Sequence, residues 1–320
     1  MIPSGTIAIN KGCIASAPAS IGNLCVGFDL LGLCLEGPSD QVTAVPNESG
    51  IVTISVIHGD GGRLPLETQL NTAGVAAQSV LRKAGVAIGL DLIVTKGLPL
   101  GSGMGSSAAS AVAAAVAANG ALGNPFSKLD LLAACLDGEA VASGAKHGDN
   151  AFPCLLGGLL LMRGNEAKDI SHLYPPDDFR IAFVHPELKV LTAEARSILP
   201  DSYSRSACLQ QMASLSSFVL AIQQGDYDLM AASLNDIIAE PYRAKLIKGY
   251  DEAKQAAAAS KSIGFGISGS GPSVFAICRG KSAAVHTANA MAKAFADLGI
   301  ASQTYCSAVN ETGAKVEAFL

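Results

Sequence analysis

The chain has 320 residues, 49% of them apolar and 15% charged, and its formal net charge at pH 7 is −5. This length and composition predict a globular protein with a sizeable core, in two domains rather than one. They exclude a disordered or a collagen-like chain. The negative net charge provides no general attraction to nucleic acid or to an anionic membrane. Any phosphate group must therefore be bound by local geometry and not by a basic surface.

The eight cysteines occur singly, with no CxxC pair and no Cys/His cluster of the kind that binds zinc. A protein of this size does not need disulfides, so we expect free thiols in a reducing compartment. The first twenty residues lack the basic start and apolar core of a signal peptide. The uncharged stretch 105–123 is rich in Ala, Gly, Ser and Asn, which favours a buried helix over a membrane span. We therefore expect a cytoplasmic protein.

In the first half of the chain, β-branched alternation and helical apolar periods identify the elements. We predict strands at 12–17, 52–58 and 90–96, and helices at 71–85, after the glycine-rich run at 99–109, and at 127–144. Ser127 is the predicted N-cap of the last of these helices. The strand at 90–96 leads into the glycine-rich run, so the local order is strand, loop, helix.

From Leu155 onward the pattern changes, and helices dominate. We predict strands at 155–162 and 180–186, helices at 192–198, 206–224, 226–238 and 241–260, a strand–turn–strand element at 264–280, a helix at 281–298 and a closing strand near 302–309. No low-complexity linker separates the halves. We therefore predict two closely packed domains, residues 1–170 and 171–320.

The glycine-rich run reads PLGSGMGSSAA. Small residues that lead into a helix N-terminus are typical of an anion cradle made of backbone N–H groups. A Walker A loop would need a lysine here, and a dinucleotide fingerprint would need a glycine where Ser106 stands. What remains is a tight structural turn or a lysine-free nucleotide loop, whose positive charge comes from the helix dipole and a metal ion. The predicted nucleotide-binding residues are Pro99, Leu100, Gly101, Ser102, Gly103, Met104, Gly105, Ser106, Ser107, Ala108 and Ala109.

The run matches the ATP loop of the GHMP small-molecule kinases, P-x-x-x-G-[LM]-G-S-S-[AS], position by position. Two further segments agree. APASIGNLCVGFDLLG at 17–32 resembles the first motif of the family, and GFGISGSGPSVFAI at 264–277 resembles its third. Each of these segments alone would be a local turn or a glycine-rich hairpin. Together the three motifs, spread over most of the chain, resemble the GHMP kinase family.

The resemblance implies an α+β fold in two layers. Residues 1–170 would form an ATP-loop domain of the ribosomal-protein-S5-like type, and residues 171–320 a ferredoxin-like α/β domain. It also implies ATP and Mg²⁺ as cofactors, with Ser107 and Glu139 as metal ligands. Both residues offer the oxygen atoms that Mg²⁺ prefers.

Segments at 139–158, 189–200 and 238–250 are similar to the branch of the family that phosphorylates L-homoserine, in threonine biosynthesis. The resemblance thus implies L-homoserine as substrate and no nucleic-acid or membrane partner, with a homodimer as one possible assembly. The candidate catalytic residues are Asn23, Asp29, His147, Asn150, Arg196 and Arg243.

Arginine can bind a substrate carboxylate through two parallel hydrogen bonds, and Asp29 can pair with an ammonium or a hydroxyl group. His147 and Asn150 lie three apart in a glycine-rich turn that suits polar substrate groups. Surface ion pairs, local caps and a structural histidine are the alternatives for these side chains taken singly. We assign no catalytic base. A kinase of another small alcohol such as mevalonate, or a non-catalytic ligand-binding relative, remains open.

Overall fold

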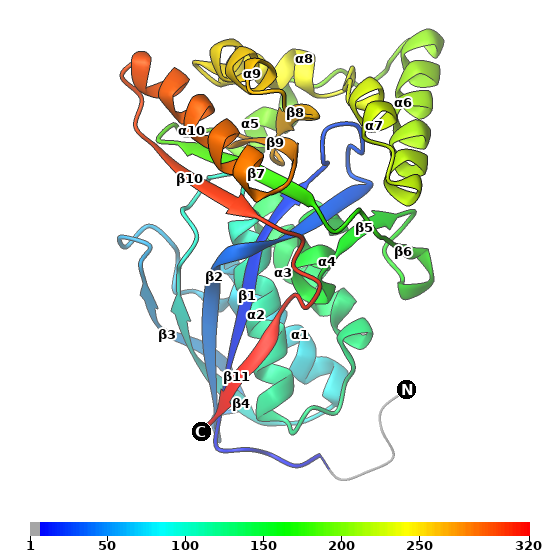
Figure 1. The fold of residues 1–320 in the computed structure, drawn as a ribbon. Coiled ribbons are helices and arrows are strands. Elements are labelled where there is room, and N and C mark those ends of the chain that lie inside the picture. Colours follow the sequence, from blue (N-terminus) through cyan, green and yellow to red (C-terminus); the bar gives the residue numbers. More distant parts are fainter. Residues whose placement is uncertain (1–6) are drawn as a thin grey trace.

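The computed structural model describes residues 7–320. It contains two β-sheets, each covered by helices, with the larger sheet in the lower part of Figure 1 and the smaller one above it. The strands of the first sheet are β1 (Cys13–Gly22), β2 (Leu31–Asn47), β3 (Val52–His58), β4 (Gly89–Thr95), β5 (Leu159–Met162), β6 (Ile170–Leu173) and β11 (Lys315–Phe319). Those of the second are β7 (Phe179–Pro186), β8 (Gly264–Ile267), β9 (Val274–Arg279) and β10 (Ser302–Ser307).

The order in the first sheet is β11-β1-β2-β4-β3, and β5 joins β2 to β6. Only the β3–β4 pair in it is parallel. The second sheet is antiparallel throughout, in the order β10-β7-β9-β8. The mixed α+β class expected from the sequence is confirmed. The boundary at 170/171 stays a prediction, although β6 still pairs with β5 and β11 returns to the first sheet beside β1.

Helices pack on both sheets. Near the first sheet lie α1 (Thr72–Ala84), α2 (Ser106–Ala121), α3 (Leu132–Ser143) and α4 (Gly148–Leu156). The remaining helices are α5 (Thr192–Ser197), α6 (Arg205–Gln224), α7 (Tyr227–Ser233), α8 (Glu240–Arg243), α9 (Tyr250–Ala259) and α10 (Lys281–Asp297). Short 3-10 turns lie at η1 (Thr68–Leu70), η2 (Lys128–Leu131), η3 (Ala167–Asp169) and η4 (Ala244–Leu246).

Helix α2 is buried on all sides, and Ser107 is its only residue that is not. It packs against α1, α3, β1 and β2, which its many alanines permit because small side chains let neighbouring backbones approach closely. The prediction of a buried helix is confirmed. Within residues 7–320, no helix is long and apolar enough to cross a membrane.

Local sequence patterns predicted several helices and strands correctly. The predicted helix at 71–85 is α1, which is capped by the Asn71 side chain and ends at Gly85 in the left-handed region, with φ of 67°. The strand at 52–58 is β3. Ser127 forms a capping box with Asp130, as expected at a helix start, although the first turn is the 3-10 turn η2.

Other predictions were wrong. The helix at 226–238 ends at Ser233, because the Asp236 carboxylate accepts backbone N–H groups of residues 238–240 and offers them an alternative to the helix. The helix at 241–260 is broken, and α9 starts only after Gly249, whose φ is 89°. His147 and Asn150 are not in a loop, since His147 caps α4 and Asn150 lies in its first turn. The sequence patterns missed β2, β6 and β11.

Candidate active site

A cavity of about 380 Å³ lies where the glycine-rich loop meets α3, α4, α5 and the turn after β8. This volume is typical of sites for small molecules. Every residue predicted for catalysis lines it: Asn23, Asp29, His147, Asn150, Arg196 and Arg243. So do both predicted metal ligands and the loop residues Leu100, Gly101, Ser102, Gly103, Gly105 and Ser106. The structure thus brings side chains from distant parts of the chain to one place.

The backbone of the loop is held from outside the cavity. Three successive carbonyl oxygens accept hydrogen bonds: that of Ser102 from the Ser273 hydroxyl at 2.5 Å, that of Gly103 from the Ser268 hydroxyl at 2.6 Å, and that of Met104 from the Ser20 N–H at 3.0 Å. Because each peptide unit directs its N–H opposite to its C=O, these bonds fix the orientation of the peptide units of the loop. The N–H of Met104 donates to the Ser102 hydroxyl at 3.3 Å. The loop leads directly into the N-terminus of α2, where the helix dipole adds partial positive charge.

Two glycines of the loop are needed for this geometry. Gly103 has φ of 75°, and a Cβ there would lie 2.6 Å from the carbonyl oxygen of Ser268. Gly105 has φ of 69°, and its Cβ would collide with the Ser20 hydroxyl. Only glycine combines the left-handed conformation with so close an approach. The third motif therefore supports the loop directly, as the hairpin that carries Ser268.

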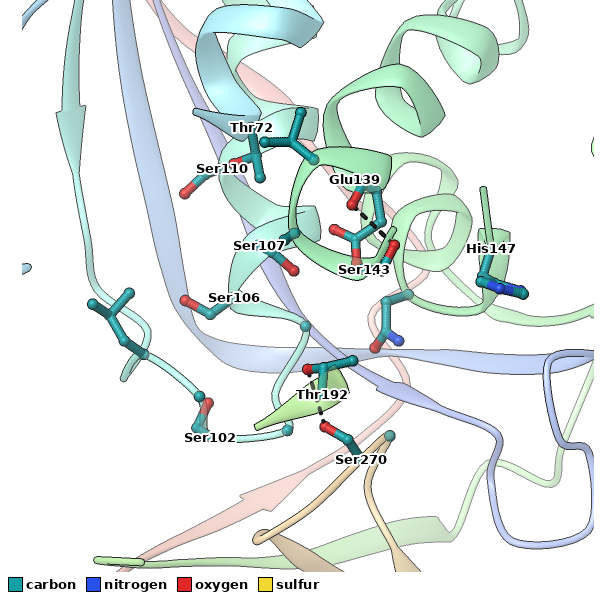
Figure 2. A pocket seen from close by; sticks show the side chains of 18 of the residues that line it. Thr72, Ser102, Ser106, Ser107, Ser110, Glu139, Ser143, His147, Thr192 and Ser270 are labelled. Carbon is teal, nitrogen blue, oxygen red and sulfur yellow. Dashed lines mark hydrogen bonds between the residues drawn. The ribbon is translucent and has the colours of Figure 1, made fainter. Parts of the chain in front are cut away.

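Ser107 and Glu139 face each other from α2 and α3, as Figure 2 shows. Glu139 is 8% exposed, and among the described residues its Oε2 atom has no hydrogen-bond partner. Burial raises the pKa of its carboxyl group to about 8, and the Ser107 hydroxyl opposes this in part. A buried carboxylate oxygen without a partner, next to a hydroxyl group, fits a hard divalent cation.

No group of three or more His, Cys, Asp or Glu side chains that could hold a metal ion occurs within residues 7–320.

The opposite end of the cavity carries charged side chains. Arg196 donates to both carboxylate oxygens of Asp29, at 2.9 Å and 3.3 Å. His147 Nδ1 lies 3.4 Å from the same carboxylate. Burial lowers the pKa of His147, Asp29 opposes this shift, and Arg196 reinforces it. The ring is therefore mainly neutral at pH 7.

Arg243 is a buried cation, 4% exposed. Its donors reach the carbonyl oxygens of Ala195 and Gly269, at 3.0 Å and 2.9 Å. Among the described residues it has no carboxylate partner within ion-pair distance. A buried guanidinium without an acidic partner, in the wall of a cavity, fits an anionic ligand group.

Asn23 is already bonded within the protein. Its Oδ1 accepts from the backbone N–H of Asp29 at 2.9 Å, and its Nδ2 donates to the Gly269 carbonyl at 3.1 Å. Both Asn23 and Asp29 have positive φ, 69° and 57°, a conformation that Asn and Asp tolerate better than most residues. Through these two bonds Asn23 orients Asp29. Direct contact between Asn23 and a substrate stays a prediction.

Asn150 is held in the same way. The Ser20 hydroxyl donates to its Oδ1 at 3.0 Å, and its Nδ2 donates to Asp149 Oδ2 at 3.2 Å. Asp149 lines the cavity but is 6% exposed, and burial raises its pKa to about 7, with Asp29 adding to the shift. A Cβ on Gly22 would collide with the side chains of Asp149 and Asn150. The first motif, which contains Gly22, therefore also shapes this part of the cavity wall.

Several lining residues were missed by the sequence reasoning. Thr192 and Ser270 lie 3.4 Å apart at the loop's side of the cavity and are drawn together in Figure 2. Leu64, Leu70 and Asn71 line another part of the wall. These residues have no distinctive sequence pattern of their own.

Lys96 was also missed, although it stands only three residues before Pro99. Its ammonium group pairs with Asp40 and donates to the Ser106 carbonyl at 2.9 Å and the Ser110 hydroxyl at 2.7 Å. Asp40 Oδ1 in turn accepts from the N–H groups of residues 97 and 98. All three ammonium hydrogens are therefore used inside the protein, and this lysine, which also lines the cavity, anchors the start of α2.

Comparison with known proteins gives two family matches, GHMP kinases N terminal domain at residues 71–158 and GHMP kinases C terminal at residues 218–297. A homoserine kinase of Xanthomonas campestris is 43% identical over 305 residues, covering 94% of this chain and 93% of that protein. One of Chlorobaculum tepidum is 38% identical over 312 residues, covering 94% and 96%.

A crystal structure of homoserine kinase from Cytophaga hutchinsonii superposes with a TM-score of 0.93 at 38% identity, covering 97% of this chain and 98% of that one. A mevalonate kinase of L. major, 14% identical with a TM-score of 0.68 and covering 96% and 98%, shares the fold alone. The resemblance found in the motifs is confirmed: the chain belongs to the homoserine kinase family of GHMP kinases.

Proposed function

We propose that this protein transfers the γ-phosphoryl group of ATP to the side-chain hydroxyl of L-homoserine. The proposal rests on one observation: the two ends of a single cavity offer different kinds of binding group. One end offers backbone N–H groups at a helix N-terminus, and the other offers Asp29 together with Arg196 and Arg243. An amino acid carries one positive and one negative group, which this set of opposite charges can bind.

The phosphates of ATP would lie along residues 101–107, with the adenine toward Leu64, Leu70 and Asn71. Ser107 and Glu139 would hold Mg²⁺, which when bound neutralises charge on the β- and γ-phosphates. No other metal ligand is assigned.

At the acceptor end, Arg196 and Arg243 would bind the carboxylate of homoserine, and Asp29 its ammonium group. Asp29 now pairs with Arg196, so binding inserts the amino acid between two charges that already satisfy each other. His147 and Asn150 would border the hydroxyl.

In the reaction, the hydroxyl oxygen forms a bond to the γ-phosphorus while the bond from that phosphorus to the bridging oxygen breaks. The hydroxyl proton passes to phosphate or water, and ADP leaves. Catalysis then depends on in-line placement and on charge stabilisation.

Release of ADP, measured in a coupled assay with L-homoserine, mevalonate and galactose, tests the proposal. We expect kcat/KM for L-homoserine to exceed that for the other two by at least about 100-fold, because neither of them carries an ammonium group that could bind Asp29. A rate with homoserine no higher than background would overturn the proposal. A cytoplasmic location and a homodimer remain predictions.

A further inference from the structure

We propose that the ring of Phe28 positions both substrate-binding arginines and thereby sets the enzyme's selectivity for acceptors that carry a carboxylate. The inference rests on the proposed function, since it concerns the end of the cavity assigned to homoserine. Phe28 does not itself line the cavity. It acts through the arginines and is a positioning residue.

The Phe28 ring lies under two guanidinium groups from different elements. The Cζ atom of Arg243 lies 5.1 Å from the ring centroid, and that of Arg196 lies 5.6 Å from it. Both distances fall within the range in which the negative face of an aromatic ring attracts a cation. One half-buried ring thus touches both cations of the acceptor end.

Two like charges held this close repel each other. Burial lowers the pKa of Arg243, and the neighbouring Arg196 adds to this shift. An aromatic ring stabilises both cations without adding a formal negative charge. A carboxylate in its place would pair with the guanidinium groups and compete with the substrate carboxylate.

The ring is most important for Arg196. Among the described residues, Asp29 is the only hydrogen-bond partner of the Arg196 side chain, and Arg196 Nε has none. When the substrate ammonium group engages Asp29, that pairing weakens. The contact with Phe28 does not depend on Asp29, so it can hold Arg196 in both states.

The chain also places the ring next to the acid. Phe28 immediately precedes Asp29, in a turn that Asn23 closes by accepting the Asp29 N–H. Consecutive residues of one turn therefore serve the two charged groups of the amino acid. Asp29 would bind the ammonium group directly, and Phe28 would act on the carboxylate by holding the two arginines. Their spacing is fixed by the backbone of this turn.

The test compares Phe28→Leu, Phe28→Met and Phe28→Tyr with the wild-type enzyme on two acceptors. One is L-homoserine, and the other is L-homoserinol, in which a hydroxymethyl group replaces the carboxylate. We expect Phe28→Leu and Phe28→Met to raise KM for homoserine about 10-fold, with kcat and the KM for ATP changed less than about twofold. Phe28→Tyr, which keeps the ring, should restore the wild-type KM. For homoserinol, kcat/KM should be the same in all four proteins.

Phe126→Leu is the matched control, because the Phe126 ring also lies under a cation, with Lys83 Nζ at 5.0 Å, but does not line the cavity. It should leave the KM for homoserine unchanged. Thermal unfolding of each variant shows whether it folds. If Phe28→Leu does not fold, Phe28→Met is used in its place for the kinetic comparison.

An equal loss of kcat/KM on both acceptors, or no loss on either, would overturn the inference while leaving the proposed function intact. A wild-type enzyme inactive on homoserine would instead overturn the proposed function, and with it the role given to the arginines.

Discussion

At the phosphate end of the cavity, binding groups come from the backbone of one continuous segment, residues 101–107, and Glu139 is the one acidic side chain placed among them. At the acceptor end, the charged side chains come from four separate parts of the chain: Asp29, His147, Arg196 and Arg243. A backbone cradle fits any polyphosphate, because it recognises charge and shape alone. Side chains of both signs at fixed positions recognise one arrangement of charges. In the proposed function, the first end therefore serves a cofactor shared by many kinases, and the second selects the substrate.

Replacing Glu139 should give the largest effect, because it removes the only charged metal ligand from the backbone-built end. We expect Glu139→Gln to lower kcat about 1,000-fold and to leave the melting temperature unchanged or raised, since burial already disfavours the charged carboxylate. Steady-state kinetics and thermal unfolding measure the two effects.

Asp137→Asn is the control for this variant, because Asp137 lies on the same helix but pairs with Lys146 and Arg82. It should retain nearly full activity. A Glu139→Gln enzyme within tenfold of wild-type kcat would show that the metal assignment is wrong.

The loop itself can be tested with two glycines that share a conformation and differ in surroundings. Gly101 and Gly103 have φ of 68° and 75°, but a Cβ on Gly101 has no neighbour closer than 3.9 Å, whereas one on Gly103 meets the Ser268 carbonyl at 2.6 Å. Alanine at either position adds backbone strain of about 1 kcal/mol. We expect Gly103→Ala to lower kcat/KM for ATP about 100-fold and Gly101→Ala less than tenfold. Equal losses would mean that the hairpin does not shape the loop.

At the side-chain end, Arg243→Met should raise KM for homoserine about 30-fold, as expected for loss of a charge-assisted hydrogen bond. The KM for ATP should not change, because Arg243 acts on the acceptor alone. Arg279→Met is a suitable control, since Arg279 is an exposed arginine paired with Asp178 far from the cavity lining. A parallel rise in the KM for ATP would contradict the separation of the two ends.

A further effect concerns pH. Burial raises the pKa of Asp149 from 3.8 to about 7 in the folded protein. Between these values the unfolded chain has lost a proton that the folded protein keeps, so the free energy of unfolding decreases as pH rises from about 4 to about 7. The decrease from this group is at most about 4 kcal/mol. Chemical denaturation across this pH range measures it, and Asp149→Asn should remove that part of the slope; an unchanged slope in the variant would assign it to other groups.

The sequence predicted the phosphate end far better than the acceptor end. The strand β4, the loop and α2 are consecutive, and each has a local signature: β-branched residues, glycines with positive φ and a run of alanines. Strands β11 and β2 were missed because they pair with strands far away in the chain, and local propensity carries little of that information.

The acceptor residues were identified only through resemblance to a family. From the sequence alone, Arg196 cannot be distinguished from an ordinary surface arginine, and no residue near it in the sequence indicates that Asp29 is its partner. The sequence analysis considered lysine only within the loop, whereas Lys96, which follows β4, reaches the first turn of α2 through the Ser106 carbonyl.

By itself the sequence predicted that the loop at 99–109 binds phosphate through its backbone, because glycine conformations and a helix start are properties of neighbouring residues. Only the tertiary structure decided which way the loop's N–H groups face, since carbonyls of residues 102–104 are fixed by donors on β1 and on the hairpin after β8. It alone also placed one aromatic ring, Phe28, under two arginines that lie far along the chain. Charge complementarity in space depends on which segments the fold brings together, and that is set by packing of the whole chain.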